Sequence, residues 1–404
     1  MDECEETATP GEEPAPPREA PAIRGLAEVS DLAGRLYGLL SRHEWSEFDA
    51  EAATAVLDID ELAAGTVLDE LADAGMLTRC EVSAGSSEEW WQLNDPAHAR
   101  TVAGRALSPQ ELESATGKLL GFYADTASSA RAAAAPYLDT PLPEHARVFS
   151  DRDAALAWLR SHHSVLVSAA GWAHQHGRHT DALAIVHGLW PLYLHDRPAD
   201  WVATDQLGLA AARAGNDPAA VARMLDRLGA AHAHTGDEQA ALARFTEANK
   251  LWEQLDNPHK IAGSLRRCAD VAVRQGRYDD AIEQFHHGIA QHRGLGEPRA
   301  MALGLIGLGD ALNHAGRPSE ALTAASEATA IFTDQADAPH ADPYNAARAR
   351  LVLAAANSAQ GELDEAWDLL SDARRQMRAA ASPHGQAMVA AAIAELARRT
   401  PPAT

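Results

Sequence analysis

The sequence repeats itself at long, nearly constant spacing. A glycine is followed five residues later by an alanine at Gly177…Ala182, Gly236…Ala241, Gly276…Ala281, Gly316…Ala321 and Gly361…Ala366, the last four glycines lying 40, 40 and 45 residues apart. Another small residue stands seven positions before each glycine, at Ala170, Gly229, Ala269, Gly309 and Ala354. Such a period is typical of a solenoid of stacked helix pairs, in which no pair buries its apolar face alone. Small residues let two helices approach closely, and glycine ends a helix in the left-handed conformation at low steric cost.

This unit resembles the tetratricopeptide repeat. Besides the small residue, the glycine and the alanine, it carries Phe245 or Phe285 four residues after the alanine. The typical repeat has about 34 residues, so the helices here are expected to be longer. The resemblance is good over residues 218–380 and loose over 165–215. It implies a superhelix whose first helices line a concave surface, and repeats of this kind bind many different partners.

The composition limits the class of protein. The net charge is −24 with only three lysines, which disfavours nucleic acid as a partner because phosphates attract Lys and Arg. The three cysteines are scattered and form no CxxC motif, so no disulfide framework is expected. The first residues are acidic and proline-rich, unlike a signal peptide, and no run of 18 apolar residues occurs. We therefore expect a cytoplasmic protein that does not enter a membrane.

The chain divides into four predicted parts. Residues 1–25 form a disordered acidic, proline-rich tail. Residues 26–107 form a small winged-helix-like domain of three helices and a hairpin, with the wing tip at 83–87. Residues 108–215 form a helical connector that contains a degenerate first repeat. Residues 216–400 form the repeat solenoid, closed by a polar capping helix. The predicted fold class is mainly α.

The order of these parts gives a second resemblance. The segments LLSRHEWSEFDAEAATAVLDIDELAAGTVLDELADAGMLT and FSDRDAALAWLRSHHSVLV, followed by GLW and the repeats, resemble the C-terminal half of bacterial STAND regulators, the NB-ARC ATPases that carry tetratricopeptide repeats. The resemblance covers residues 28–380 and implies a regulatory role. The family's ATPase carries a P-loop, but no GxxxxGK[ST] occurs here. Asn94 stands where the family has a nucleotide-sensing histidine. We therefore expect this chain to lack the ATPase and to use no nucleotide or other cofactor.

Winged helices often bind DNA, so the charge of this domain is informative. Residues 28–107 contain sixteen Asp and Glu against five Arg and no Lys. The expected recognition helix, DELAAGTVLDELADAG from Asp60, has five carboxylates and no basic residue. Placed in a major groove, these carboxylates would face phosphates. The favoured interpretation is a winged helix that packs against protein, and DNA binding is the alternative.

Catalytic and metal sites find little support in the sequence. No GxSxG, dinucleotide fingerprint or HExxH is present, and the histidine groups at 162–163, 174–179, 232–234 and 286–287 lack zinc-ligand spacing. We predict no catalytic residues and no metal. The predicted binding surface is the concave groove of the repeats, with side chains at Arg266, Asp270, Arg274, Asp310, Asn313 and His314. Arg and Asn can hold a peptide backbone or carboxylate by hydrogen bonds. The alternative is that Arg266–Asp270 and Arg274–Asp310 form ordinary surface ion pairs across the groove.

The predicted function is that of a non-enzymatic regulatory or adaptor protein that binds a protein or peptide through its repeats. The alternative is a ligand-sensing transcriptional regulator that binds DNA through the winged helix. A third possibility is an accessory protein of a biosynthetic enzyme. The sequence leaves the partner, the pathway and the oligomeric state open.

Overall fold

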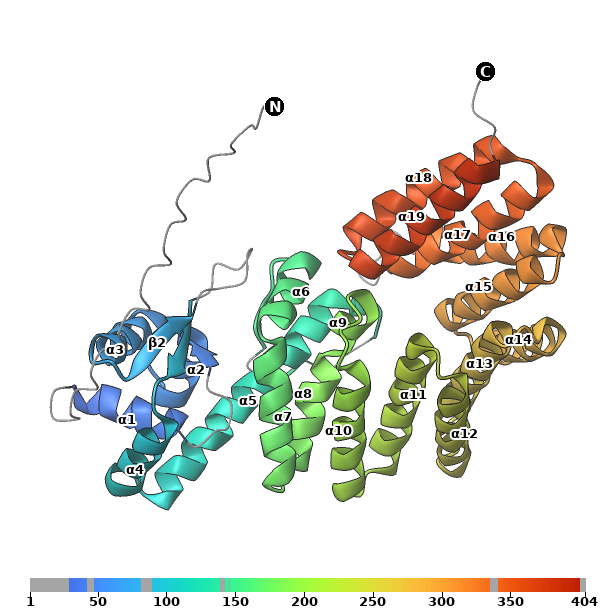
Figure 1. Ribbon diagram of the computed structural model, residues 1–404. Helices are drawn as coiled ribbons and strands as arrows, with labels where there is room; N and C mark the ends of the chain where they lie inside the picture. The colour runs from blue at the N-terminus through green and yellow to red at the C-terminus, as the bar shows by residue number, and fades with distance from the viewer. Residues whose placement is uncertain are drawn as a thin grey trace, which may run out of the picture. The chain divides into compact units, whose positions relative to one another are not determined.

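The computed structural model describes residues 29–41, 47–80, 89–138, 142–144, 146–334 and 341–399 (Figure 1). The predicted tail at 1–25 and wing tip at 83–87 lie outside these described residues. The described chain forms two compact units, one up to residue 115 and one from residue 116. In the described part, no helix combines the length and apolar character needed to cross a membrane.

The first unit combines short helices with a three-stranded antiparallel sheet in the order β1-β3-β2. Its elements are α1 (Asp31–Leu40), β1 (Glu47–Asp49), α2 (Ala50–Leu57), α3 (Glu61–Asp73), β2 (Leu77–Cys80), β3 (Trp90–Leu93) and α4 (Pro96–Ala106). Asp49 and Asp60 cap α2 and α3 through hydrogen bonds to the third backbone N–H beyond them, which confirms the predicted starts of these helices. Strand β1, which the sequence analysis did not assign, pairs Phe48 with Trp91 beside the predicted hairpin.

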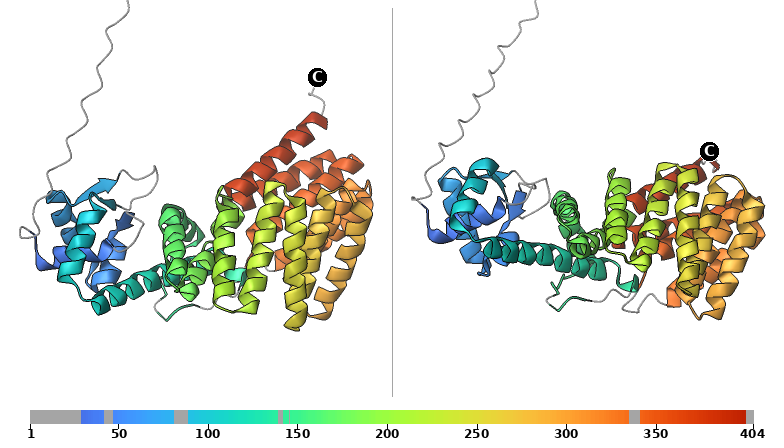
Figure 2. Two further views of the ribbon diagram at one scale, coloured as in Figure 1. Left: turned by 60° about the horizontal axis from the view of Figure 1, so that its bottom comes forward. Right: turned by 90° about the horizontal axis from the view of Figure 1, so that it is seen from below.

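The second unit is a stack of antiparallel helices (Figure 2). It begins with α5 (Pro109–Ala134), which starts in the first unit, and a short 3-10 helix (Pro136–Leu138). The next helices are α6 (Arg152–Ser161), α7 (His163–Gln175), α8 (His179–Gly188), α9 (Trp190–His195) and α10 (Trp201–Ala214). Four regular pairs follow: α11 (Pro218–Thr235) and α12 (Glu238–Gln254), α13 (Pro258–Arg274) and α14 (Tyr278–Gly294), α15 (Pro298–His314) and α16 (Pro318–Asp334), α17 (Pro343–Gln360) and α18 (Leu363–Ala379). Helix α19 (Pro383–Arg399) covers the last pair.

The repeated residues do what their spacing predicts. The five glycines that follow a first helix all have a left-handed backbone, with φ between 72° and 90° (Gly177, Gly236, Gly276, Gly316 and Gly361). The alanines five residues later are completely buried. At two of the small positions a Cβ would collide with the neighbouring helix: 2.5 Å from the ring of Phe245 at Gly229, and 2.8 Å from Val352 at Gly309. Glycine is therefore required there for close helix packing.

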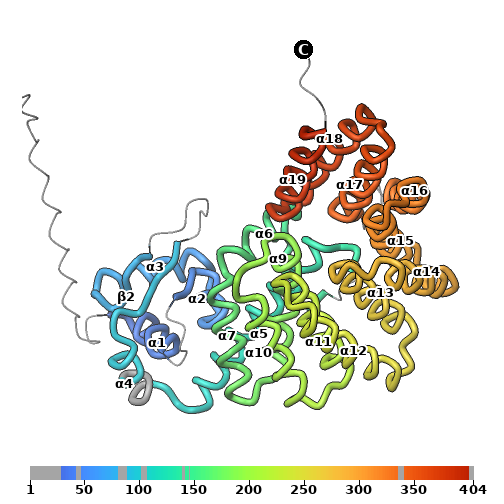
Figure 3. Tube along the Cα trace, turned by 45° about the vertical axis from the view of Figure 1, so that its right-hand side comes forward, coloured from blue at the N-terminus to red at the C-terminus, as the bar shows by residue number. Residues whose placement is uncertain are grey.

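The four regular pairs follow a curved path (Figure 3). The first helix of each pair contacts the first helix of the next, from α11 through α13 and α15 to α17, whereas the second helices make no comparable contact with one another. The first helices therefore lie on the tighter side of the curve. We call the surface formed by α11, α13, α15 and α17 the inner face.

The two ends of the second unit meet. The Arg160 side chain, on α6, is bound to Asp196 by two hydrogen bonds and also donates to the carbonyl of Ala381, at 3.1 Å. The buried Ser382 hydroxyl donates to the carbonyl of His195, at 3.4 Å. Helix α19 accordingly lies beside α9 (Figures 1 and 3). These contacts join residues 221 and 187 positions apart and close the curve of the repeats.

Substitution of two glycines by alanine would test how closely the helices of this unit pack. A Cβ at Gly188, on α8, would lie 2.4–2.9 Å from Ala127 of α5, including backbone atoms that cannot move aside. Gly171, within α7, has no neighbour within 4 Å of that position. We expect Gly188→Ala to lower the free energy of unfolding by about 1–3 kcal/mol, whereas Gly171→Ala raises it by about 0.5–1 kcal/mol. Urea denaturation of both variants measures this difference, and equal midpoints would contradict the close α5–α8 crossing.

Candidate ligand-binding face of the repeats

The first helices and the second helices of the repeat pairs form two layers that differ in charge. The first helices α11, α13, α15 and α17 carry nine Lys and Arg against three Asp and Glu. The second helices α12, α14, α16 and α18 carry six against thirteen. The chain as a whole has a net charge of −24. The layer that forms the inner face is therefore basic within a strongly acidic protein.

Many of the basic side chains on this layer are held by carboxylates. Arg299, at the start of α15, is bonded to the buried Asp342 at 2.6 Å and lies over the ring of Tyr137, whose centroid is 4.1 Å away. Arg267 is bonded to Asp226 at 3.2 Å. Asp226 is 5% exposed and also accepts hydrogen bonds from the side chains of Trp252 and Ser264. These groups tie neighbouring helices together.

The predicted site residues Arg266 and Asp270 both belong to α13. The ion pair that the alternative interpretation predicts between them is present, at 2.8 Å, but it joins positions i and i+4 of this one helix and does not cross the groove. Burial lowers the pKa of Arg266 to about 10 in spite of the opposite effect of Asp270. Arg266 is only 18% exposed, which leaves it little surface for a ligand.

Arg274 and Asp310 do not form the ion pair that the alternative interpretation predicts. The guanidinium of Arg274 donates to the backbone carbonyl of Ala233 in the preceding pair, at 2.7 Å. Asp310 instead faces His314, four residues on in the same helix, at 3.7 Å. Arg274 and Arg348 still act on Asp310 from a longer distance, because both oppose the rise in its pKa that burial causes.

The remaining predicted residues lie at the end of α15. Asn313 donates a hydrogen bond to the carbonyl of Val352 in α17, at 3.0 Å, and so links two pairs. The ring of His314 stacks on Tyr278, with centroids 5.5 Å apart and an interplanar angle of 9°. Of the six predicted residues, Arg274, Asp310 and His314 are exposed and Asn313 is half-buried.

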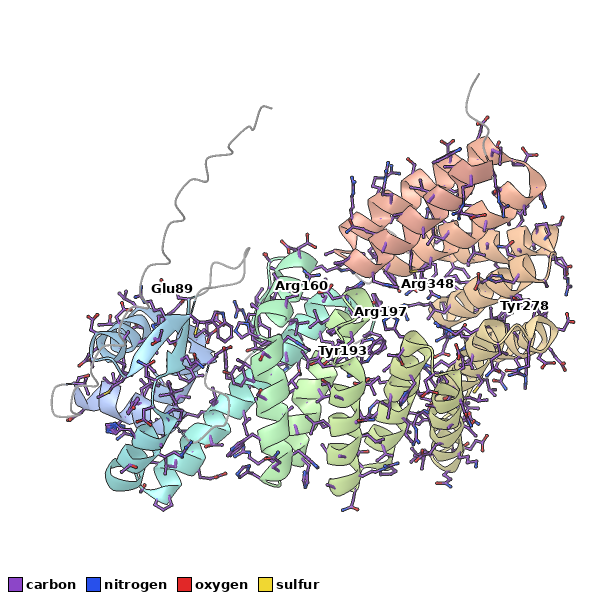
Figure 4. All side chains as sticks on the ribbon, viewed as in Figure 1. Glu89, Arg160, Tyr193, Arg197, Tyr278 and Arg348 are labelled. Carbon is purple, nitrogen blue, oxygen red and sulfur yellow. The ribbon has the colours of Figure 1, made fainter. Side chains whose placement is uncertain are left out.

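A group of basic side chains gathers where the ends of the array meet. Arg197, in the connection from α9 to α10, donates to Nδ1 of His234 at 2.7 Å. The ring of His234 lies 6.0 Å from that of His384 on α19. Arg274 is adjacent, because it binds the carbonyl of residue 233. Arg348 belongs to α17 and donates to Asn345 at 3.0 Å (Figure 4).

These groups lie close enough together to affect one another's pKa. The pKa of His384 is lowered to about 4. Burial is the largest cause, and Arg197, His234 and Arg348 act in the same direction. Burial also lowers the pKa of Arg197; Tyr344 opposes this effect, and Arg348 and Arg274 add smaller contributions in the direction of burial. Like charges at short range disfavour one another. The five side chains thus form one basic cluster, drawn from the α9–α10 connection, α11, α13, α17 and α19.

Only part of this cluster could be predicted from the sequence. Arg274 is a predicted site residue five positions after the small residue Ala269, and His234 stands five positions after the small residue Gly229. Arg348 stands six residues before the small residue Ala354, one helical turn before the position that corresponds to Arg266. Arg197 and His384 lie outside the regular repeats, so no repeat spacing predicts them. The charge difference between first and second helices was readable in the sequence and would have directed attention to α17.

The first unit offers an acidic surface. The exposed residues of α3 include Glu61, Asp69 and Asp73, together with Leu62, which is 83% exposed. Asn94, at the position of the family's histidine, accepts a hydrogen bond from the Thr78 hydroxyl at 2.6 Å and donates to the carbonyl of residue 75 at 2.8 Å. Its side chain is therefore occupied in holding the β2–β3 hairpin.

The architecture and the repeat residues define an α-solenoid of tetratricopeptide repeats. The family model of the tetratricopeptide repeat matches residues 260–334. A curated relative, the regulatory protein AfsR of Streptomyces griseus, is 24% identical over 319 residues, which are 77% of this chain and 32% of the relative. The chain thus spans about a third of the length of that protein.

Two solved structures are similar to this chain at low sequence identity. A STAND protein with a tetratricopeptide repeat sensor from Pyrococcus horikoshii is 12% identical, with a TM-score of 0.38 over 87% of this chain and 51% of that chain. A Rap protein in complex with Competence and Sporulation Factor is 11% identical, with a TM-score of 0.44 over 91% of this chain and 87% of that chain.

Proposed function

We propose that this chain is a non-enzymatic, cytoplasmic regulatory or adaptor protein that binds a protein or peptide partner on the inner face of its repeats. The observation that carries the proposal is the separation of charge between the basic first helices and the acidic second helices. A surface of the opposite sign to the rest of the molecule orients and attracts a complementary partner. The similarity to a regulatory protein and to repeat-containing sensors supports a regulatory context.

The proposal assigns the first unit a packing role. Its element order of α1, β1, α2, α3 and the β2–β3 hairpin agrees with the predicted winged helix of residues 26–107. The exposed carboxylates of α3 and the absence of any Lys from residues 28–107 weigh against DNA as its ligand.

The test is capture of a partner by the immobilised full chain from native lysate, with mass spectrometry of the retained proteins. Arg274→Glu reverses one charge on the inner face. Arg293→Glu makes the same change on the second helix α14, where Arg293 is paired with the exposed Glu327. We expect a protein that the parent and Arg293→Glu retain and that Arg274→Glu retains at least tenfold less. If all three chains retain the same proteins equally, the inner face is not the binding surface.

The DNA-binding alternative has its own test. Specific binding of duplex DNA by the full chain that weakens steeply between 50 and 200 mM salt would favour the alternative of a transcriptional regulator. We expect no such binding at either salt concentration. Partner capture that depends on Arg274 combined with no affinity for DNA supports the adaptor.

A further inference from the structure

In the basic cluster of Arg197, His234, Arg274, Arg348 and His384, no arginine forms an ion pair with a carboxylate of the described residues, and Asp310 acts on Arg274 and Arg348 from beyond ion-pair distance. Other arginines of the first helices are ion-paired, as Arg266 is with Asp270 and Arg299 with Asp342. No carboxylate of the described residues lies within 4.0 Å of the guanidinium groups of Arg197, Arg274 or Arg348. Three guanidinium groups thus lie here without a directly bonded carboxylate, and the more distant Asp310 carries one negative charge against their three positive charges.

Their hydrogen bonds leave donors free for a ligand. Arg274 and Arg348 each donate one printed hydrogen bond through a single terminal nitrogen, to the carbonyl of Ala233 and to Asn345. A guanidinium has five N–H donors in a planar fork that matches a carboxylate or a phosphate. The side chain of Arg197 interacts with Tyr344, but its buried Nε has no hydrogen-bond partner among the described residues. A buried donor without a partner is costly, and an anion would satisfy it.

The surroundings of the cluster fix its shape. Arg197 has a left-handed backbone, with φ of 55°, a conformation that non-glycine residues rarely adopt. The ring of Trp201 packs against His234 at 5.8 Å, and the buried Tyr344, one turn before Arg348 on α17, packs against the His195 ring at 5.1 Å. The cluster therefore stands on rigid elements that the closure of the array brings together, which is the arrangement expected of a preorganised site.

From this geometry we infer that the cluster is an anion-binding site, which holds a carboxylate or phosphate group of an acidic peptide on the inner face. The inference rests on the proposed function and adds the chemistry of the ligand to it. The ligand would place its anionic group between Arg197, Arg274 and Arg348, where it neutralises like charges and accepts their free N–H groups. The two histidines, which are neutral without a ligand because burial and the arginines lower their pKa, become easier to protonate beside the bound anion.

The experiment measures the binding of fluorescein-labelled peptides to the full chain by anisotropy at low salt. The probes are hexaglutamate, its neutral counterpart hexaglutamine, and a Gly-Ser peptide with and without phosphorylation of its serines. Arg348→Gln removes one guanidinium from the cluster. Arg350→Gln is the matched control, because Arg350, two residues further along α17, is bound to Gln376 of α18 at 3.1 Å.

We expect hexaglutamate or the phosphorylated peptide to bind the parent at least tenfold more tightly than its neutral counterpart, and the tighter of the two identifies carboxylate or phosphate as the ligand group. Arg348→Gln should lose about tenfold in affinity, and Arg350→Gln should stay within about twofold of the parent. Without peptide, Arg348→Gln should melt at the same temperature as the parent or higher, because it relieves repulsion between like charges. A loss of affinity through misfolding would instead lower the melting temperature.

Equal affinity of the parent and Arg348→Gln, or no preference for either anionic peptide, would overturn the anion site. If Arg274→Glu still releases a captured partner in that case, the proposed function stands and only the chemistry assigned to the ligand is wrong. If Arg274→Glu also retains the partner as well as the parent does, both proposals are wrong.

Discussion

Replacing Arg227 with leucine is expected to lower the free energy of unfolding by about 3–5 kcal/mol, as removal of one partner of a buried ion pair usually does. Arg227, on α11, is bonded to Asp205 of α10 at 2.6 Å, and the side chain of Asp205 is completely buried. The same guanidinium donates to the carbonyl of Val186 in α8, at 2.9 Å. Leucine would leave Asp205 in the core with only the Trp201 indole, 2.8 Å away, as a hydrogen-bond donor.

The measurement is urea denaturation at pH 7, followed by circular dichroism. Arg213→Leu is the control, because Arg213 pairs with Glu247 at a similar distance of 2.8 Å but both side chains are at least 40% exposed. Exposed pairs contribute about 0–1 kcal/mol, so this variant should stay close to the parent. The double variant Asp205→Leu/Arg227→Leu should recover much of the loss, because no unpaired charge remains in the core. Equal stability of Arg227→Leu and Arg213→Leu would contradict this account.

Replacing His195 with leucine is expected to make the protein more resistant to acid. His195 is completely buried at the junction of α9 with α17 and α19, and neither of its ring nitrogens has a hydrogen-bond partner. Its pKa is lowered from 6.5 to about 4, first by burial and then by Arg152, with smaller opposing effects of nearby carboxylates and a further lowering by Arg160. The ring is therefore neutral in the folded protein at pH values where the unfolded chain already binds a proton.

The direction of the pH effect follows from proton linkage. Because the pKa is lower in the folded state, the unfolded state takes up the proton first, and stability is lost as the pH falls from about 6.5 to about 4. A shift of this size corresponds to roughly 3 kcal/mol. His195→Leu should match the parent within about 1 kcal/mol at pH 7 and lose less stability by pH 4.

Urea denaturation at several pH values between 7 and 4 tests this expectation. His286→Leu changes an exposed histidine on α14 and should follow the pH dependence of the parent. Parallel curves for the parent and His195→Leu would contradict the assignment of a neutral, buried imidazole at the closure. A leucine variant that is strongly destabilised already at pH 7 would show that the ring is needed for packing against Tyr344 rather than tolerated there.

The limits of the sequence are clearest at residues that interact across the array. Arg274 was predicted as a site residue with Asp310 as its alternative partner, yet it binds the carbonyl of residue 233 in the preceding pair. The choice between these partners depends on the offset of two helices about 40 residues apart in the chain. A side chain as long as arginine reaches either neighbour, so spacing in the sequence could not decide between them.

The basic cluster depends even more on the tertiary structure. Arg197 and His384 are separated by 187 positions and lie outside the regular repeats. They meet because the array curves until α19 contacts α9. Curvature accumulates from small rotations between successive pairs, and no single residue encodes it. Strand β1 was missed for a similar reason, since a three-residue strand is stabilised by its pairing with β3 rather than by its own pattern.

The sequence by itself determined the helix pairs, their ends and their close packing, because these depend on local properties. Gly316 ends its helix in the left-handed conformation and Ala321 is buried against its neighbours wherever the repeat stands in the array. It also determined the division of charge between first and second helices. Only the tertiary structure decided which of those charges are neutralised and which remain together unpaired, because that outcome depends on the register between pairs and on the closure of their ends.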